Sequence, residues 1–235
     1  MNTSNVFLPD PDEPFSIVIP TRNEAGTIAD IVTRSLRLTP HVWVMDGASS
    51  DGTPQLAAQA GARVVTVPER GKGRAIRAVV DHVTTPIIVF IDADGSHVVE
   101  DIPRLLAPLR AGAADHVQAS RLIGGSSELH GGFDEFLRLS GSALITALIN
   151  WRFKVRLSES QNGFRAIRLD LLRSLNLKEN ITTIEQEMVM KTLKIGGRLA
   201  EVPSHEHQRL CGHSSIRLGR VWWRYVYVLV IGLFF

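Results

Sequence analysis

Two aspartates separated by a single alanine, Asp92 and Asp94, follow directly after an apolar run at 86–91. A buried strand of this composition would place both carboxylates at its carboxyl end, the edge of an open α/β sheet where ligands bind. Paired carboxylates suit Mg²⁺ or Mn²⁺, and either ion can hold a diphosphate. The alternative is that the two aspartates only cap the helix that follows. The pair alone leaves both interpretations open.

The apolar run before the aspartates is the last of four, and each of the first three is followed by a polar or glycine-containing loop and a helical segment. The four runs occupy 15–20, 41–45, 62–67 and 86–91. Strands that alternate with helices indicate a mostly parallel sheet with helices on both faces. Parallel strands end at one common edge, so we expect the loops at 21–26, 46–53 and 71–73 to join the aspartate pair. The predicted fold class is therefore α/β.

The second half of the chain alternates less regularly. We expect helices at 101–111, 133–153 and 184–195, and strands at 115–120, 163–167 and 198–202. The apolar segment at 221–235 contains two tryptophans and two tyrosines. It is shorter than the ~20 residues that a spanning helix needs, and its aromatic residues suit the headgroup level of a bilayer. We predict an apolar C-terminal helix that associates with a membrane surface, with packing against the domain or a partner, or a complete span, as alternatives.

The composition is that of a globular protein, with 44% hydrophobic and 21% charged residues. The net charge of +2 gives no reason to expect nucleic acid as a partner, and the single cysteine, Cys211, excludes an internal disulfide. Basic residues at 138–156 and at 209–224 accompany the two apolar segments, a pattern that suits an anionic membrane surface. The leader at 1–14 lacks the features of a signal peptide, so we expect the cytoplasmic side of a membrane.

Four early motifs occur together in the order and spacing of a known enzyme family. They are IVIPTRNE at 17–24, VMDGASSDGT at 44–53, GKG at 71–73 and DAD at 92–94, and they resemble family 2 glycosyltransferases with the GT-A fold. Four later pieces resemble the dolichol-phosphate (polyprenyl-phosphate) mannosyltransferase branch of that family. These are SR at 120–121, ESQNGFRAIR at 159–168, EVP at 201–203 and RLCGHS at 209–214.

The resemblance implies an inverting, metal-dependent transfer of a hexose from a GDP- or UDP-sugar to a polyprenyl or dolichyl phosphate. The enzyme would be peripheral or monotopic on the cytoplasmic side of the membrane, and its oligomeric state stays open. A phosphate monoester has a second pKa near 6, so the acceptor needs no general base at neutral pH. The implied boundaries are 1–14 for the leader, 15–120 for a nucleotide-sugar half and 121–216 for an acceptor half of the domain 15–216, and 217–235 for the tail.

The same resemblance implies roles for individual residues. The nucleotide sugar would bind at Pro20, Thr21, Asn23, Glu24, Asp46, Gly71, Lys72, Gly73 and Asp92. Mg²⁺ or Mn²⁺ would bind at Asp92, Asp94 and Ser96. The acceptor phosphate would bind at Arg121, Arg138 and Ser214, and the catalytic group would be Asp92, Asp94 and Arg209. In this group the metal and Arg209 would stabilise the departing nucleoside diphosphate.

The chain departs from the family pattern at three positions of this site. Arg22 replaces a usual tyrosine, Gly47 replaces a second aspartate, and Ser96 stands where a glutamine often helps to hold the metal. Two other functions are kept as alternatives. One is a soluble glycosyltransferase with a small phosphorylated acceptor such as a glycerate, and the other is an inactive nucleotide-sugar-binding scaffold subunit.

Several polar residues also have purely structural explanations. Asp51 suits a turn or a cap, and Glu24 could instead favour a helix dipole from a first turn. Arg165 and Arg168 could form ion pairs with acids such as Glu159 or Asp170. The histidines near Arg209 suit either a surface loop or a second metal site; they are His205, His207 and His213.

Overall fold

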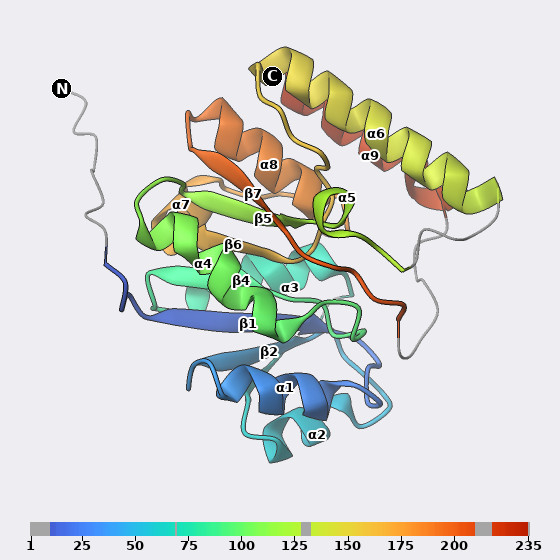
Figure 1. Ribbon diagram of the computed structural model, residues 1–235. Helices are drawn as coiled ribbons and strands as arrows, with labels where there is room; N and C mark the ends of the chain where they lie inside the picture. Colours follow the sequence, from blue (N-terminus) through green and yellow to red (C-terminus); the bar gives the residue numbers. More distant parts are fainter. Residues whose placement is uncertain (1–9, 69, 128–132, 210–217, 235) are drawn as a thin grey trace.

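A mixed sheet forms the centre of the protein (Figure 1). The computed structural model describes residues 10–68, 70–127, 133–209 and 218–234. Within these ranges seven strands form one sheet in the order β3-β2-β1-β4-β6-β5-β7. The strands are β1 (Phe15–Thr21), β2 (Val42–Asp46), β3 (Arg63–Thr66), β4 (Ile87–Phe90), β5 (His116–Ser120), β6 (Arg165–Arg168) and β7 (Leu199–Pro203). Only β6 among them runs antiparallel, to both β4 and β5, so the mostly parallel sheet is confirmed.

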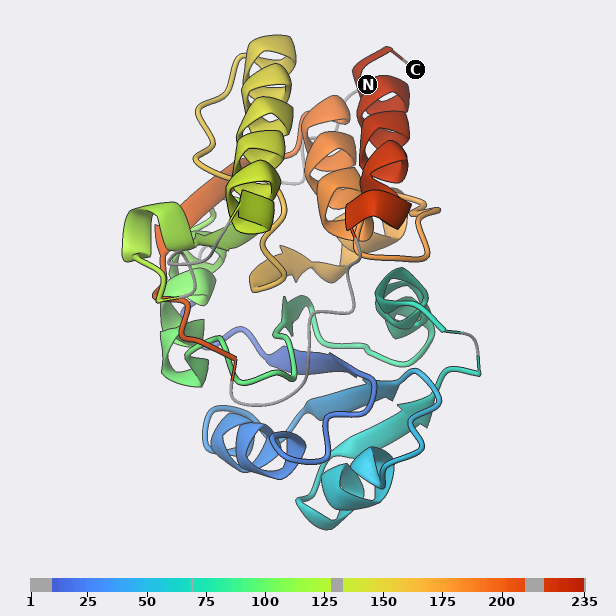
Figure 2. The same ribbon diagram turned by 90° about the vertical axis from the view of Figure 1, so that its right-hand side faces the viewer.

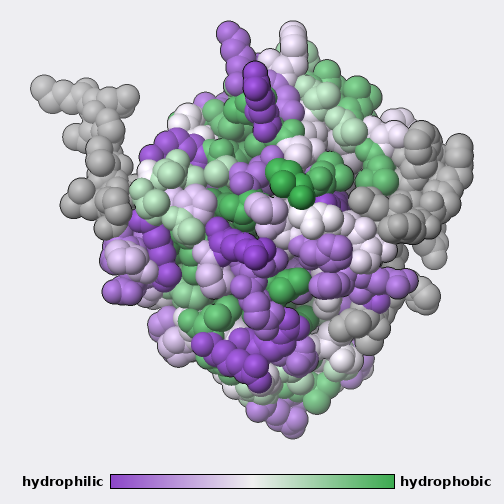
Figure 3. Space-filling model, viewed as in Figure 1, coloured by the Kyte–Doolittle hydropathy of each residue, from purple (hydrophilic) through white to green (hydrophobic). Residues whose placement is uncertain are grey.

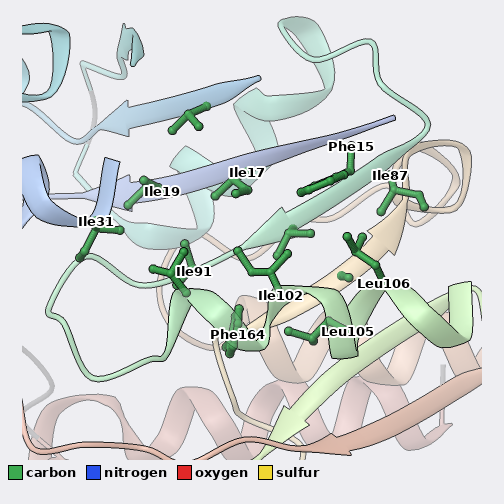
Figure 4. Close-up of a cluster of buried hydrophobic side chains, with 14 of the residues drawn as sticks. Phe15, Ile17, Ile19, Ile31, Ile87, Ile91, Ile102, Leu105, Leu106 and Phe164 are labelled. Atoms are coloured by element: carbon green, nitrogen blue, oxygen red, sulfur yellow. The ribbon is translucent and has the colours of Figure 1, made fainter. Parts of the chain in front are cut away.

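Helices cover both faces of this sheet. One face packs against α1 (Ile28–Leu36), α2 (Thr53–Gln59) and α4 (Ile102–Arg110), and the other against α3 (Lys72–Ala78), α7 (Leu169–Ser174) and α8 (Ile184–Lys194). Alternate strand residues supply the two cores because successive side chains point to opposite faces. Ile17 and Ile19 therefore join the first core (Figure 4), and Val18 joins the second. The shorter elements are α5 (Arg121–Gly124), η1 (Val79–Asp81) and η2 (Val99–Asp101).

The neighbouring strands β1 and β4 form the switch point of the sheet. From β1 the chain winds outward through β2 and β3, and it then crosses back to place β4 on the other side of β1. Such a reversal opens a crevice at the carboxyl ends of the two strands, where ligands bind in α/β proteins. The loop after β1 and the loop after β4 are joined here, because the Thr27 hydroxyl donates to the Ala93 carbonyl at 2.5 Å.

Helix α8 also forms a group with two further helices on one side of the sheet (Figure 2). The helices are α6 (Phe133–Phe153), α8 and α9 (Leu218–Phe234). They share a small core formed by Ile149, Leu157, Val189, Met190, Leu229 and Leu233. Helix α6 has the bounds that the sequence predicted. Among the described residues, no helix combines the length and the apolar character needed to cross a membrane.

Helix α9 is only partly covered by its neighbours. Large apolar side chains remain exposed on α9 and on the nearby α6. Figure 3 shows hydrophobic residues on the side of the molecule where α6 lies. We call this set the apolar helix surface; it consists of Leu144, Trp151, Trp222, Trp223, Val226, Tyr227, Val230, Ile231 and Phe234. One side of α9 therefore packs against the domain, as the alternative for the tail expected, and the other side is not covered by the described residues.

Helix α9 is also tied to the loop that precedes α8. Arg224 pairs with Glu179 through two contacts of 3.0 and 3.2 Å. The Tyr225 hydroxyl lies 2.8 Å from the Thr182 hydroxyl. The same loop contacts the start of α3, where the Gly73 N–H donates to the carbonyl of Asn180 at 3.1 Å. The loop at 178–183 therefore connects the C-terminal helix with the predicted donor-binding glycines.

Some local details lie outside the sequence-based expectations. Gly52 is the N-cap of α2 with a φ of 89°, a backbone conformation that favours glycine. Helix α3 changes to a 3₁₀ turn, η1, after Ala78. Neither α7 nor the antiparallel direction of β6 was predicted. Short elements of this kind are fixed by tertiary contacts that a local pattern does not contain.

Phe164→Ala should lower the free energy of unfolding by about 3–5 kcal/mol, because the wild-type ring is fully buried and its removal leaves a cavity. Chemical denaturation followed by circular dichroism measures the change. Leu122→Ala is the matched control; its side chain is 51% exposed, so the expected change is within about 0.5 kcal/mol. Equal losses in the two variants would contradict the packing described for Phe164.

Candidate functional site

Polar groups interlock the loops that follow β1 and β2. Asn23, which adopts a φ of 58°, donates its N–H to the Ser49 hydroxyl at 2.8 Å, and its side-chain oxygen accepts from the Ser50 N–H at 2.9 Å. The buried Asp46 carboxylate accepts from the Ser49 N–H at 3.0 Å and from its hydroxyl at 2.5 Å. These predicted nucleotide-binding residues lie together at the carboxyl edge. The Asp46 carboxylate is already committed to shaping its own turn.

Asp51 has the structural role that was its alternative. Its carboxylate accepts from the Thr53 N–H at 3.1 Å, from the Thr53 hydroxyl at 2.6 Å and from the Ala25 N–H at 3.1 Å. Burial opposes the charged form of Asp51, but these hydrogen bonds prevail and lower its pKa. Asp51 thus closes the turn before α2 and joins it to the loop after β1.

Asp92, at the end of β4, lies in a dense group of charges. Its Oδ1 is 2.5 Å from Lys72 Nζ, and that ammonium is 2.7 Å from Glu185 Oε1. His97 Nε2 lies 3.7 Å from Asp92 Oδ2, and the histidine ring stacks on Phe164. Burial disfavours the charged form of Asp92, yet Lys72 and His97 lower its pKa well below the ordinary value. Burial likewise opposes the charge on Lys72, and the two carboxylates raise its pKa.

Asp94 lies between a serine and an arginine. Its Oδ1 accepts from the Ser96 N–H at 3.1 Å and from the Ser96 hydroxyl at 2.7 Å, and its Oδ2 is 3.3 Å from Arg209 Nε. The structure therefore brings Arg209 to the aspartate pair from more than a hundred residues away. The capping alternative for the pair is wrong, because the N-cap positions of η2 and α4 are Val98 and Asp101.

Glu24 adds a further carboxylate to this edge. Its Oε2 is buried and has no hydrogen-bond partner within the described chain. Burial, together with the negative charge of Asp94, raises the pKa of Glu24 to about 7, although Arg209 opposes the shift. The helix-dipole alternative for Glu24 is wrong, because α1 begins only at Ile28. A carboxylate held in this way suits the neighbourhood of a cation or of a sugar hydroxyl.

The donor set fits a divalent cation that is shared with a substrate. Mg²⁺ commonly binds through one or two carboxylates, several waters and substrate phosphates rather than in an all-protein cage. Asp92 and Asp94 supply two carboxylates, and the orphaned oxygen of Glu24 lies in the same negatively charged region. Among the described residues, no group of three or more His, Cys, Asp or Glu side chains could hold a metal. The ligand role of Ser96 stays a prediction; in the structure its hydroxyl orients Asp94.

Glycines allow close approaches around these charges. A Cβ at Gly163 would collide with Asp92 Oδ2 and would lie 2.6 Å from Lys72 Nζ. Gly71, with a φ of 135°, and Gly73 lie against the backbone at 179–180, where a Cβ at either position would collide. We expected these two glycines to allow close approach of the nucleotide sugar. In this structure they allow close approach of the loop before α8. Pro20 and Thr21 end β1 beside the same edge.

The predicted acceptor residues are less complete. Arg121 pairs with Glu159 at 3.1 Å and with Glu206 at 2.9 Å, so two carboxylates already share its charge. The Arg138 side chain and Ser214 lie outside the described residues. His205 and His207 form a ring pair with centroids 4.8 Å apart, and His213 is likewise outside the described residues. A cavity of about 480 Å³ beside the aspartate loop is lined by Arg34, Gly95, His97, Val98, Ser127, His207 and Gln208.

The structural alternative for Arg165 and Arg168 fits, with other partners than those expected. Arg165 donates to the carbonyl oxygens of Asn162 and Glu185, and Arg168 pairs with Glu13 at 2.9 Å. Sequence reasoning missed Glu185 and Gly163 as members of the site. No local signal marks them, because a glutamate in a first helical turn and a glycine in a loop are both common.

Comparison with known proteins identifies the family. The model of the family described as Glycosyl transferase family 2 matches residues 16–174. The chain belongs to glycosyltransferase family 2. Glycosyltransferase AglJ of Haloferax volcanii is 33% identical over 211 residues, which are 88% of this chain and 67% of AglJ. A dolichyl-phosphate hexose transferase of the same organism is 28% identical over 197 residues, which are 83% of each chain.

A solved structure gives the fold of this family 2 glycosyltransferase. Glucosyl-3-phosphoglycerate synthase from Mycobacterium tuberculosis, in complex with Mg²⁺ and uridine diphosphate, matches with a TM-score of 0.78 at 21% identity. The match covers 94% of this chain and 80% of that chain. The predicted GT-A fold and the predicted class of enzyme, a glycosyltransferase, are both confirmed.

Glu24→Gln should raise the free energy of unfolding at pH 8 in the presence of EDTA. Folding raises the pKa of Glu24 from 4.5 to about 7, so the folded state binds more protons than the unfolded state between these values. The wild type therefore loses stability as the pH rises through about 7, and the variant does not. The difference between the two should vanish below pH 4.5, and urea denaturation across this range measures it.

Glu100→Gln is the control of opposite sign. A hydrogen bond from Arg34 lowers the pKa of Glu100, so this variant should lose stability at neutral pH, and the loss should fade as the pH falls through the lowered pKa. A Glu24→Gln variant whose stability follows the wild type at every pH would contradict the environment described for Glu24.

Proposed function

We propose that this protein transfers a hexose, with inversion, from a GDP- or UDP-sugar to a polyprenyl phosphate. The reaction depends on Mg²⁺ or Mn²⁺ and takes place at the cytoplasmic surface of a membrane. The observation that carries the proposal is the convergence of Asp92, Asp94 and Arg209 at the switch point of the sheet. A pair of acids with a nearby arginine suits the binding of a cation and a diphosphate together.

In the proposed reaction, a phosphate oxygen of the acceptor attacks the anomeric carbon of the sugar. The new C–O bond forms as the bond to the diphosphate breaks, and the electron pair leaves with the nucleoside diphosphate. When bound, the cation neutralises the charge that develops on this leaving group. Asp92 and Asp94 would hold the cation, and Arg209 would contact the diphosphate. The acceptor is already substantially dianionic at pH 7, so no residue needs to remove a proton.

Two observations favour a lipid acceptor. The exposed apolar residues of α9, from Trp222 to Phe234, recur at intervals of one and three positions and therefore lie on one face of the helix. Contiguous apolar patches mark contacts with membranes or partners, and Trp222 and Trp223 suit the membrane interface. In addition, a relative that matches over 83% of both chains is named a dolichyl-phosphate hexose transferase.

The soluble alternative, with a small phosphorylated acceptor, has its own support. The matching solved structures include a complex of glucosyl-3-phosphoglycerate synthase with phosphoglyceric acid. At 23% identity this likeness carries the fold alone. We therefore keep a phosphorylated glycerate as the second candidate acceptor, and we test both acceptors in one assay.

The wild type, incubated with a panel of radiolabelled nucleotide sugars, polyprenyl phosphate in detergent and phosphoglycerate, should move one sugar into the organic phase. EDTA should abolish the transfer. Asp94→Asn should lower the rate by about 100-fold or more, as loss of leaving-group stabilisation does in other enzymes. Asp30→Asn is the matched control, since Asp30 is an exposed carboxylate on α1. Label that enters only an aqueous phosphoglycerate product would establish the soluble alternative, and no transfer from any donor would favour the inactive scaffold.

Binding to membranes is tested separately. The protein should cosediment with vesicles that contain anionic lipid, and a Trp222→Ser, Phe234→Ser variant should bind about tenfold or more weakly, because two large aromatic side chains no longer enter the bilayer. Ile195→Ser is the control; Ile195 is 56% exposed but lies after α8, outside the apolar helix surface. Equal binding of the three proteins would contradict the membrane role of this surface.

A further inference from the structure

Glu185 is a buried charged residue beside the site that the proposed chemistry does not use. It lies in the first turn of α8, and its side chain is 3% exposed. One carboxylate oxygen, Oε1, lies 2.7 Å from Lys72 Nζ. The other, Oε2, is buried and has no hydrogen-bond partner within the described chain. A half-satisfied carboxylate is costly to bury, so its presence calls for a specific reason.

The reason lies in how Lys72 divides its charge. Its ammonium group contacts Asp92 Oδ1 at 2.5 Å and Glu185 Oε1 at 2.7 Å. Lysine has a flexible stem and three donors, so with Asp92 as its single partner it would follow that carboxylate and neutralise it. A second carboxylate at a similar distance holds the ammonium between the two acids. Asp92 then keeps part of its negative charge for a further cation.

The position of Glu185 relative to Asp92 is fixed by the sheet. Arg165 lies opposite Phe90 in the pairing of β6 with β4, two residues before Asp92. The buried Arg165 guanidinium donates to the Glu185 carbonyl at 3.1 Å and to the Asn162 carbonyl at 3.0 Å. It therefore joins the start of α8 to the strand that leads to Asp92. Gly163 leaves the room that the side chains of Asp92 and Lys72 need, because any side chain at this position would displace one of them.

We propose that Glu185 is a positioning residue of the donor site, which acts through Lys72 to keep the Asp92 carboxylate available to the divalent cation. The inference rests on the proposed function, in that a metal–nucleoside diphosphate is the ligand of this site. The charges predict the direction of each change in affinity. Without the Glu185 charge, Lys72 pairs with Asp92 alone, and the affinity of the site for the cation falls. The affinity for a metal-free diphosphate does not fall, because the net positive charge beside it increases.

The test measures binding of Mn²⁺ together with UDP or GDP, by calorimetry and by electron paramagnetic resonance of Mn²⁺, on the full chain. Glu185→Gln should raise the Kd of Mn²⁺ about tenfold, the size of coupling expected between contacting charged groups. Metal-free UDP or GDP should bind as well as before or more tightly. The Mn²⁺ effect should disappear in a Lys72→Met background, because Glu185 acts through that ammonium. Glu185→Asp, which retains the charge, should restore part of the affinity.

Glu187→Gln is the matched control. Glu187 is a buried glutamate in the same helical turn, but it accepts from the N–H groups of Lys178 and Glu179 and pairs with Lys191. Its variant should lower stability and leave the Kd of Mn²⁺ unchanged in folded protein. If Glu185→Gln is too unstable to measure, Glu185→Asp replaces it: its shorter side chain lies farther from Lys72, so the Kd of Mn²⁺ should rise above the wild-type value, and an unchanged Kd would overturn the inference.

The outcomes separate this inference from the proposed function. A wild type that binds Mn²⁺ with a nucleotide, and a Glu185→Gln variant with the same Kd, would overturn the positioning role alone. A Glu185→Gln effect that persists in the Lys72→Met background would overturn it as well. A wild type that binds neither UDP nor GDP with Mn²⁺ would overturn both the proposed function and the inference.

Discussion

The carboxylate of Asp92 stands at the carboxyl end of a buried strand, and it can remain charged there only with a cation beside it. Lys72 supplies that charge from the start of α3, which precedes β4 in the sequence. Taking an ion pair out of water is costly unless its geometry is well defined. Much of the surrounding structure serves this geometry, including the absence of a side chain at Gly163 and the seating of α8 against β6.

The antiparallel strand β6 explains how the two halves of the chain make one site. It lies between β4 and β5, and so brings Arg165 and the loop before it next to the end of β4. Each aspartate of the pair is thereby linked to a residue of the second half. Asp92 is linked to Glu185 through Lys72, and Asp94 contacts Arg209. Chemistry at this edge therefore depends on both halves of the domain, even though the four motifs that resemble family 2 as a whole lie in the first.

Local patterns were sufficient to predict the first four strands, the full length of α6 and the meeting of polar loops at one edge. In these cases hydrophobic periodicity and turn residues act within a few positions. The same reasoning failed for Glu185 and for the partners of Arg165, because a contact across many residues leaves no trace in the neighbouring sequence. It predicted the turn at Asp51, but not the hydrogen bond from the Ala25 N–H that joins this turn to the loop after β1.

The loop at 178–183 touches α9 on one side, through Arg224 and Tyr225, and the glycines at the start of α3 on the other. At Gly73 the loop meets backbone with backbone, so no flexible side chain can absorb a movement. A displacement of α9 relative to the sheet must therefore either break the pair of Arg224 with Glu179 or carry the glycine segment with it. The loop therefore couples the position of α9 to that of Gly73. Gly73 is the sequence neighbour of Lys72, whose ammonium pairs with Asp92.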